Sequence, residues 1–75
     1  METILRKYRE MKTKNQGCLI LMRDGDFYKA FDNDAKDLAL ATGEKMMTKG
    51  GFSATIFHAN MFDVNLPKLL KAGFR

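Results

Sequence analysis

Residues 19–31 read Leu19-Ile-Leu-Met-Arg-Asp-Gly-Asp-Phe-Tyr-Lys-Ala-Phe31, with two apolar runs on either side of Asp24-Gly25. This dipeptide readily supplies the positive φ angles of a two-residue turn, so the stretch predicts a β-hairpin. The first arm, residues 18–23, is almost continuously apolar, which is typical of a strand that is covered on both faces. We therefore expect the rest of the chain to pack around this hairpin.

The second arm, residues 26–31, presents an aromatic residue and a charged residue side by side. A period of two places Phe27, Lys29 and Phe31 on one face of the strand. Phe27 and Lys29 are therefore the candidate functional pair. The competing interpretation is that Phe27 belongs to the core, because an aromatic residue in a strand usually packs inward and Phe31 shares its face. A bulge beyond the turn would separate the two phenylalanines.

Three helices are predicted. The first covers residues 2–14, and its two faces differ: an apolar stripe of Ile4, Leu5, Tyr8 and Met11 opposes a basic face of Arg6, Lys7, Arg9, Lys12 and Lys14. The second is expected to begin after an N-cap at Asp32 or Asn33 and to end at Gly43. The third is expected to begin after an N-cap at Asp63, with Pro67 near its first turn and an apolar stripe of Phe62, Leu66, Leu69 and Leu70.

Two more strands are predicted between the second and third helices. Residues 45–49 form a short one, Gly50-Gly51 is either a turn or a flexible break, and residues 52–59 alternate loosely as the other. The predicted fold class is α+β: a small mixed or antiparallel sheet with a β-hairpin, flanked by about three helices. Residues 1–75 are expected to form a single domain.

The composition indicates a globular protein with a polyanionic partner. Of the 75 residues, 45% are hydrophobic and 29% charged, and the net charge is +4. The longest apolar run, residues 18–22, is far shorter than the ~20 residues that cross a bilayer, and no secretion signal is expected. A single cysteine, Cys18, excludes an internal disulfide and is expected to be a small core residue. These features predict a cytoplasmic protein with no membrane contact, and the basic charge favours nucleic acid.

Catalytic chemistry is not expected. His58 is the only histidine, so neither a histidine pair nor a histidine–cysteine metal site can be assembled, and His58 is expected to pack or to cap a turn. The acidic residues near the hairpin are explained by turns and helix caps. Thr48-Lys49-Gly50-Gly51 lacks the spacing of a phosphate-binding loop. The sequence therefore predicts a protein that is not an enzyme and needs no cofactor or metal.

Four blocks of sequence carry a family resemblance. They are Gly25-Asp26-Phe27-Tyr28-x-x-Phe31 followed by Asp34-Ala35-Lys36, then Thr48-Lys49-x-Gly51, then Phe57-His58-Ala59, and finally Leu66-Pro67-Lys68-Leu69-x-x-Ala72-Gly73. In this order they resemble the N-terminal mismatch-recognition domain of the DNA mismatch repair protein MutS, over nearly the whole chain. The resemblance implies double-stranded DNA as the partner. It also implies a further apolar strand after residue 75, so that the sheet has an open edge or is completed by another chain.

The resemblance assigns Phe27 a role and makes Lys29 a departure from the family. The phenylalanine that matches Phe27 stacks on a mispaired base from the minor groove. Two residues later the family has a glutamate that hydrogen-bonds this base, where this chain has Lys29, which cannot accept a hydrogen bond and attracts phosphates. We therefore expect DNA binding with weakened selectivity for mismatches. The expected DNA-binding residues are Phe27, Lys29, Lys45 and Lys49, with the basic face of the first helix.

A second hypothesis is a non-catalytic protein-interaction module. In that interpretation the incomplete sheet edge pairs with another chain, and the protein is a homo-oligomer. An exposed Phe27 beside basic residues favours DNA binding, whereas a buried Phe27 and an apolar open edge favour the interaction module.

Overall fold

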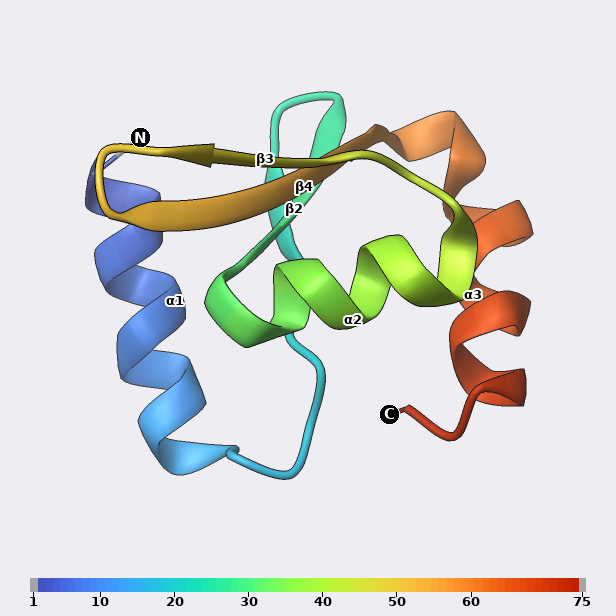
Figure 1. The fold of residues 1–75 in the computed structure, drawn as a ribbon, viewed down its shortest axis with the longest axis horizontal. Helices are drawn as coiled ribbons and strands as arrows, with labels where there is room; N and C mark the ends of the chain where they lie inside the picture. Colours follow the sequence, from blue (N-terminus) through green and yellow to red (C-terminus); the bar gives the residue numbers. More distant parts are fainter. Residues whose placement is uncertain (1, 75) are drawn as a thin grey trace.

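The computed structural model describes residues 2–74, which form three α-helices and a four-stranded antiparallel sheet (Figure 1). In chain order the elements are α1 (Glu2–Lys14), β1 (Met22–Asp24), β2 (Phe27–Phe31), α2 (Asp32–Thr42), β3 (Met46–Lys49), β4 (Phe52–His58), the short 3-10 helix η1 (Ala59–Met61) and α3 (Phe62–Lys71). The strand order in the sheet is β1-β2-β4-β3. The predicted α+β class is confirmed, and of the two arrangements left open the sheet is antiparallel.

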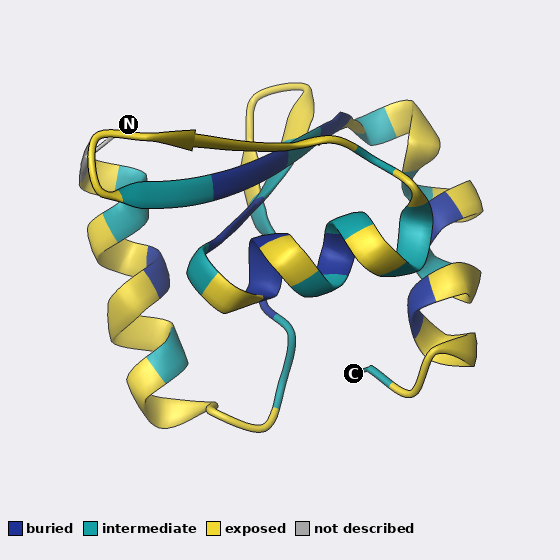
Figure 2. Ribbon diagram, viewed as in Figure 1, coloured by how far each residue is buried: buried dark blue, intermediate teal, exposed yellow. Residues whose placement is uncertain are grey.

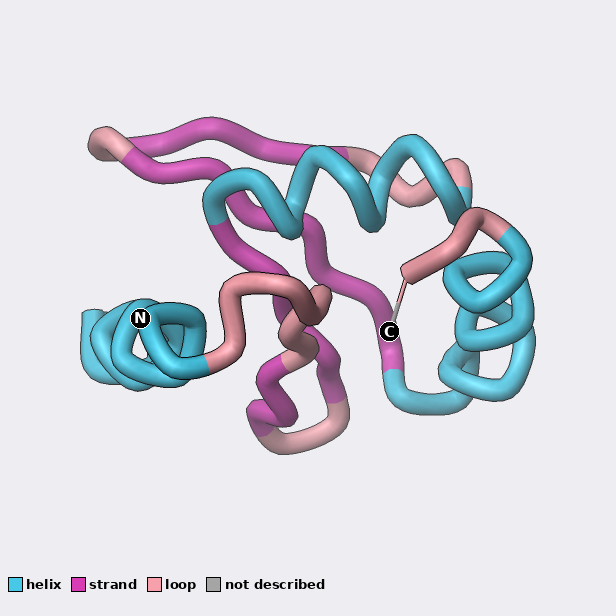
Figure 3. The backbone as a smooth tube through the Cα atoms, turned by 90° about the horizontal axis from the view of Figure 1, so that it is seen from below, coloured by secondary structure: helices cyan, strands magenta, loops and turns pink. Residues whose placement is uncertain are grey.

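Helices cover both faces of the sheet. On one face Phe31 and Ala54 pack with Tyr8 of α1, and the rings of Tyr8 and Phe31 lie 5.5 Å apart. On the other face Ala30 and Phe57 pack with residues of α2 and α3. Figure 3 shows α1 on one side of the strands and the other two helices on the opposite side. Burial follows the same division, because the buried residues lie along β2, β4 and the helix sides that face them (Figure 2).

The hairpin turn lies one residue later than the sequence pattern predicts. Asp24 pairs with Phe27, so the two central residues of the turn are Gly25 and Asp26 instead of Asp24 and Gly25. Gly25 has φ 61°, and a glycine with positive φ at the first central position is what a type II′ hairpin turn requires. The prediction failed because both dipeptides are good turn formers, and only the pairing of the strands selects between them.

The first arm is shorter as a strand than predicted. β1 begins at Met22, whereas residues 18–21 are not paired as a strand. The backbone N–H of Ile20 donates instead to Oδ2 of Asp34, at 3.1 Å. The arm is nevertheless covered on both faces as expected, because Ile20 packs on the α1 side while Leu19 and Leu21 pack on the side of α2 and α3.

Asp34 is a buried carboxylate that joins three segments of the chain. Besides the bond from Ile20, Oδ2 accepts from the hydroxyl of Tyr8 at 2.8 Å, and Oδ1 lies 2.9 Å from Nζ of Lys12. Burial and this carboxylate raise the pKa of the Tyr8 phenol. Because its ammonium group pairs with this buried carboxylate, Lys12 faces inward and does not belong to the basic face of α1. The predicted place of Met11 in the apolar stripe of α1 is wrong, because its side chain is exposed.

The helix starts also differ from the predictions. The N-cap of α2 is Phe31, and the side chain of Asp32 pairs with Arg9 at 3.1 Å, so neither Asp32 nor Asn33 caps the helix. The N-cap of α3 is Met61 instead of Asp63, because the chain has already begun to coil in η1. Pro67 consequently lies inside α3.

The inward face of α3 contains a polar residue that the apolar pattern missed. Leu70 is exposed, whereas Asn65 is buried and donates from Nδ2 to Glu44 at 3.0 Å. Phe62, Leu66 and Leu69 do face inward, as predicted.

The two predicted strands are present as β3 and β4, and they pair as a second hairpin, so that Gly50-Gly51 is a turn. β3 lies at one edge of the sheet, and all four of its residues are exposed.

Candidate nucleic-acid interface

Phe27 lies at the uncovered end of a sheet face. Phe27 is 45% exposed and Phe31 is 0% exposed, although both belong to β2 and point to the same side. Pairing between β2 and β4 is continuous from Phe27 opposite His58 to Phe31 opposite Ala54, so no bulge separates the two phenylalanines. They differ because Tyr8 of α1 packs against Phe31, whereas Phe27 lies outside that buried cluster. The chain therefore presents an aromatic ring to solvent from a rigid strand.

His58 stands beside Phe27 and was not predicted as part of the site. The two rings meet edge to face, with centroids 5.4 Å apart. Nδ1 of His58 accepts the backbone N–H of Asn60 at 3.1 Å, which confirms the expected capping role. In the neutral ring the proton is then on Nε2. This neighbour could not be predicted from the local pattern, because the contact depends on the register between β2 and β4.

Lys29 is held by a carboxylate of the neighbouring strand. Its Nζ lies 2.7 Å from Oδ2 of Asp24. The Lys29 side chain is only 13% exposed, whereas that of Asp24 is 53% exposed. The hydrogen bond and charge of Lys29 lower the pKa of Asp24, so Asp24 is ionised at neutral pH. Of the two charged side chains in this pair, that of Asp24 is therefore the more accessible to solvent.

Arg23 stiffens the reverse side of the hairpin. Its Nε donates to the carbonyl of Gly25 at 2.6 Å, and its guanidinium lies 5.1 Å from the centre of the Tyr28 ring. Tyr28 in turn stacks on Phe57 and Phe62, at 5.5 and 4.9 Å between centroids. Through this series of contacts the turn that positions Phe27 is anchored to β4 and α3.

Lys45 and Lys49 do not lie next to Phe27. Both are exposed, and Lys49 pairs with Phe52 at the opposite end of β4 from His58. The six residue steps from Phe52 to His58 span about 20 Å of strand. Lys45 immediately precedes β3, whose first residue, Met46, pairs with Thr55. The predicted site residues therefore divide into a hairpin group, Phe27 and Lys29, and a separate group along β3.

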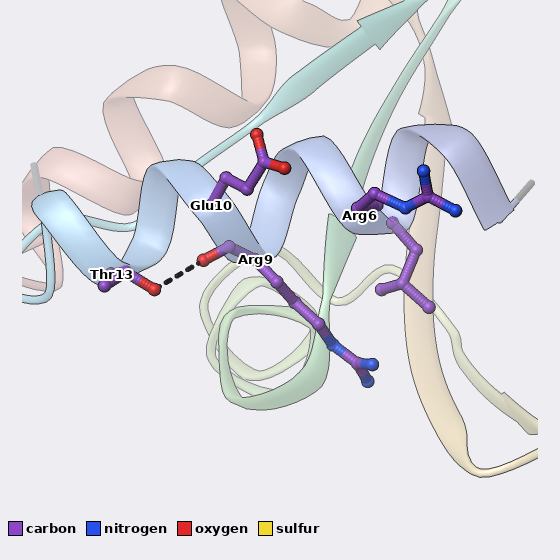
Figure 4. A pocket seen from close by; sticks show the side chains of 5 residues that line it. Arg6, Arg9, Glu10 and Thr13 are labelled. Carbon is purple, nitrogen blue, oxygen red and sulfur yellow. Dashed lines mark hydrogen bonds between the residues drawn. The ribbon is translucent and has the colours of Figure 1, made fainter.

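The basic face of α1 is partly neutralised. Arg9 pairs with Asp32, which raises the pKa of the Arg9 guanidinium, and Lys12 is directed at Asp34. Around a shallow hollow on this helix, Arg6 and Arg9 are accompanied by Glu10, which points away from Arg9 (Figure 4). Arg6, Lys7 and Lys14 remain exposed and are the basic residues of α1 most accessible to phosphates.

Over residues 2–74, the structure contains no group of three histidine, cysteine or acidic side chains arranged to hold a metal ion. Within the same span, none of the helices has both the length and the apolar character needed to cross a bilayer.

The fold and this surface define a small α+β domain with an exposed aromatic residue on a hairpin, and the comparisons place it in a family. Residues 2–75 match the family described as MutS domain I. Relatives named DNA mismatch repair protein MutS are 31% identical over 77 residues in Salinibacter ruber, 34% over 77 in Flavobacterium psychrophilum and 36% over 76 in Thermus thermophilus. Each alignment covers 96% of this chain and 8–9% of the relative. The chain belongs to the MutS domain I family and corresponds to less than a tenth of these relatives.

Proposed function

We propose that this chain is a non-catalytic DNA-binding module of DNA mismatch repair, and that it binds double-stranded DNA through Phe27. The observation that carries the proposal is the 45% exposure of Phe27 at the bare end of a sheet face. Membership of the MutS domain I family, and similarity to relatives named DNA mismatch repair protein MutS, support the assignment to mismatch repair.

The physics of a mismatch suits an exposed aromatic ring on a rigid hairpin. A mispaired base is weakly held, so inserting an apolar ring beside it costs less unstacking than at a paired step. Stacking of a base on an aromatic side chain returns roughly 1–3 kcal/mol. Because Phe27 is fixed by the paired strands β2 and β4, little conformational entropy is lost when it inserts.

The lysines supply affinity that does not depend on sequence. We propose phosphate contacts from Lys45, Lys49 and the exposed basic residues of α1, all of which are accessible. Lys29 lies on the Phe27 face and has no acceptor atom, and its charge is balanced by Asp24. The pair of Lys29 with Asp24 therefore contributes no net charge beside Phe27, and Lys29 offers no acceptor to a base. Selectivity for a mismatch is accordingly weak.

Titration of a matched and a singly mismatched duplex at two salt concentrations tests the proposal. The natural chain should bind both, with affinity that falls as salt rises by a slope near −0.9 per phosphate contacted. Phe27→Ala should weaken binding to the mismatched duplex about 5- to 140-fold, the equivalent of 1–3 kcal/mol. The control is Leu40→Ala, which removes an exposed apolar side chain from α2 and should leave affinity unchanged. Absence of binding to any duplex at low salt would refute the proposal.

A second candidate, a protein-interaction module, rests on β3. This edge strand exposes all its residues, including Met46 and Met47, and its outer backbone groups are available to another strand. We propose that two copies of the chain pair along this edge. Pairing would extend the sheet without covering Phe27, because β3 and the first hairpin lie on opposite edges.

A further inference from the structure

We propose that Asp24 is the group that accepts a hydrogen bond from a base beside Phe27, and that Lys29 positions this carboxylate instead of contacting phosphate. This inference rests on the proposed DNA binding and assigns its specificity to a residue outside the expected set.

The sheet register puts Asp24 next to the exposed ring. Asp24 and Phe27 are directly opposite each other in the β1–β2 pair, so their side chains leave the same face. Directly opposed residues of antiparallel strands have Cβ atoms about 4.5–5.5 Å apart. The carboxylate therefore stands within reach of a base that stacks on Phe27.

The ion pair leaves Asp24 with unused acceptor capacity. A carboxylate accepts up to about four hydrogen bonds, and Lys29 contributes one of them, at 2.7 Å to Oδ2. The Lys29 side chain is 13% exposed, while that of Asp24 is 53% exposed. An approaching DNA strand thus meets the carboxylate first, and a phosphate could bind Lys29 only by displacing Asp24.

The carboxylate matches what a mispaired base offers. In a matched pair the amino and imino N–H groups on the Watson–Crick edges donate to carbonyl oxygens and ring nitrogens of the partner base, whereas those of a mispaired or displaced base are open to a protein acceptor. Asp24 therefore supplies the residual mismatch selectivity that Lys29 cannot.

Exchange of each member of the pair for its neutral amide separates the two roles. Asp24→Asn releases the Lys29 ammonium, so one phosphate contact is gained: the slope of log affinity against log salt should steepen by about 0.9. Binding to matched duplex should rise several-fold at low salt, and the mismatched-to-matched affinity ratio should fall toward one. Lys29→Gln keeps the carboxylate of Asp24. The salt slope should therefore not become shallower, and the mismatched-to-matched affinity ratio should not decrease. The double variant Asp24→Asn/Lys29→Gln should recover the natural slope with the ratio still near one.

The outcomes distinguish this inference from the proposed function. If the natural chain binds DNA but Asp24→Asn changes neither slope nor ratio, the role of Asp24 is refuted and DNA binding stands. If Lys29→Gln makes the slope shallower by about 0.9, Lys29 contacts phosphate and the inference is wrong. If the natural chain binds no duplex, the proposed function fails. In that case, binding of matched duplex by Asp24→Asn would still support the inference that Asp24 keeps Lys29 away from phosphate. If Asp24→Asn also bound no duplex, both the inference and the proposed function would be refuted. Circular dichroism confirms that each variant is folded.

Discussion

Replacement of Asp34 by asparagine should destabilise the whole domain, because the geometry around this carboxylate cannot accept an amide. Oδ2 receives two donors, from Tyr8 and from the backbone of Ile20, and Oδ1 receives Lys12. An amide oxygen at the Oδ2 position turns the NH₂ group toward the Lys12 ammonium. The reverse orientation points NH₂ at the other two donors. Either way at least one buried donor loses its acceptor and faces another donor.

The expected cost is a large fraction of the stability. Breaking a buried ion pair by neutralising one partner typically costs 3–5 kcal/mol. Lys12 retains 26% exposure, so water partly compensates it and we expect about 3 kcal/mol. A domain of 75 residues has a total stability of roughly 4–11 kcal/mol. Asp34→Asn should thus lower the free energy of unfolding by between a quarter and three quarters of its total.

Urea unfolding followed by circular dichroism at neutral pH measures the effect. With a slope of about 1–3 kcal/mol per molar urea, the midpoint should move down by about 1–3 M. Asp32→Asn is the matched control: the same substitution two residues earlier breaks an exposed pair with Arg9, and should cost less than about 1 kcal/mol. Equal costs for the two variants would show that the buried carboxylate does not tie α1 to α2.

Three further predictions concern stability and assembly. Because the pKa of Tyr8 is raised in the folded state, the unfolded chain ionises first, and stability should fall as pH rises above about 10. Tyr8→Phe should remove this part of the decline; an unchanged pH dependence of the urea midpoint between pH 9 and 11 would contradict it. Phe31→Ala should lower the free energy of unfolding by about 3–5 kcal/mol, whereas Phe27→Ala should cost about 1 kcal/mol or less in the same urea assay. Equal losses of unfolding free energy in the two variants would mean that α1 does not bury Phe31 more than Phe27. Finally, self-association along β3 should appear by sedimentation at high micromolar concentration and be weakened by Met47→Lys. A monomer throughout would rule out that edge as an interface.

The elements that local pattern determines were predicted well. The helical stripe of residues 2–14, the glycine pair before β4 and the alternation of β2 each depend on neighbours in sequence, and the structure contains α1, the second hairpin and the two-faced strand. Errors arose where a distant residue competes for a local group. The backbone N–H of Ile20 donates to Asp34 instead of to a neighbouring strand, and the carboxylate of Asp32 pairs with Arg9 instead of capping α2.

The candidate site was predicted in part for the same reason. The pattern placed Phe27 and Lys29 on one face, but it could not show which end of that face α1 leaves bare. Nor could it supply Asp24 and His58, whose positions beside Phe27 follow from the register of β2 with each neighbouring strand. A turn one residue earlier would have put a different side chain opposite the ring.

The sheet face that α1 covers at one end only has a consequence for how this domain can evolve. Positions under the helix, such as Phe31 and Ala54, are constrained by packing, because any change of volume there affects the core. Positions at the bare end carry little of that constraint, so substitutions around Phe27 alter the surface while the domain remains folded. Selection on binding and selection on folding therefore act on different residues of the same strand.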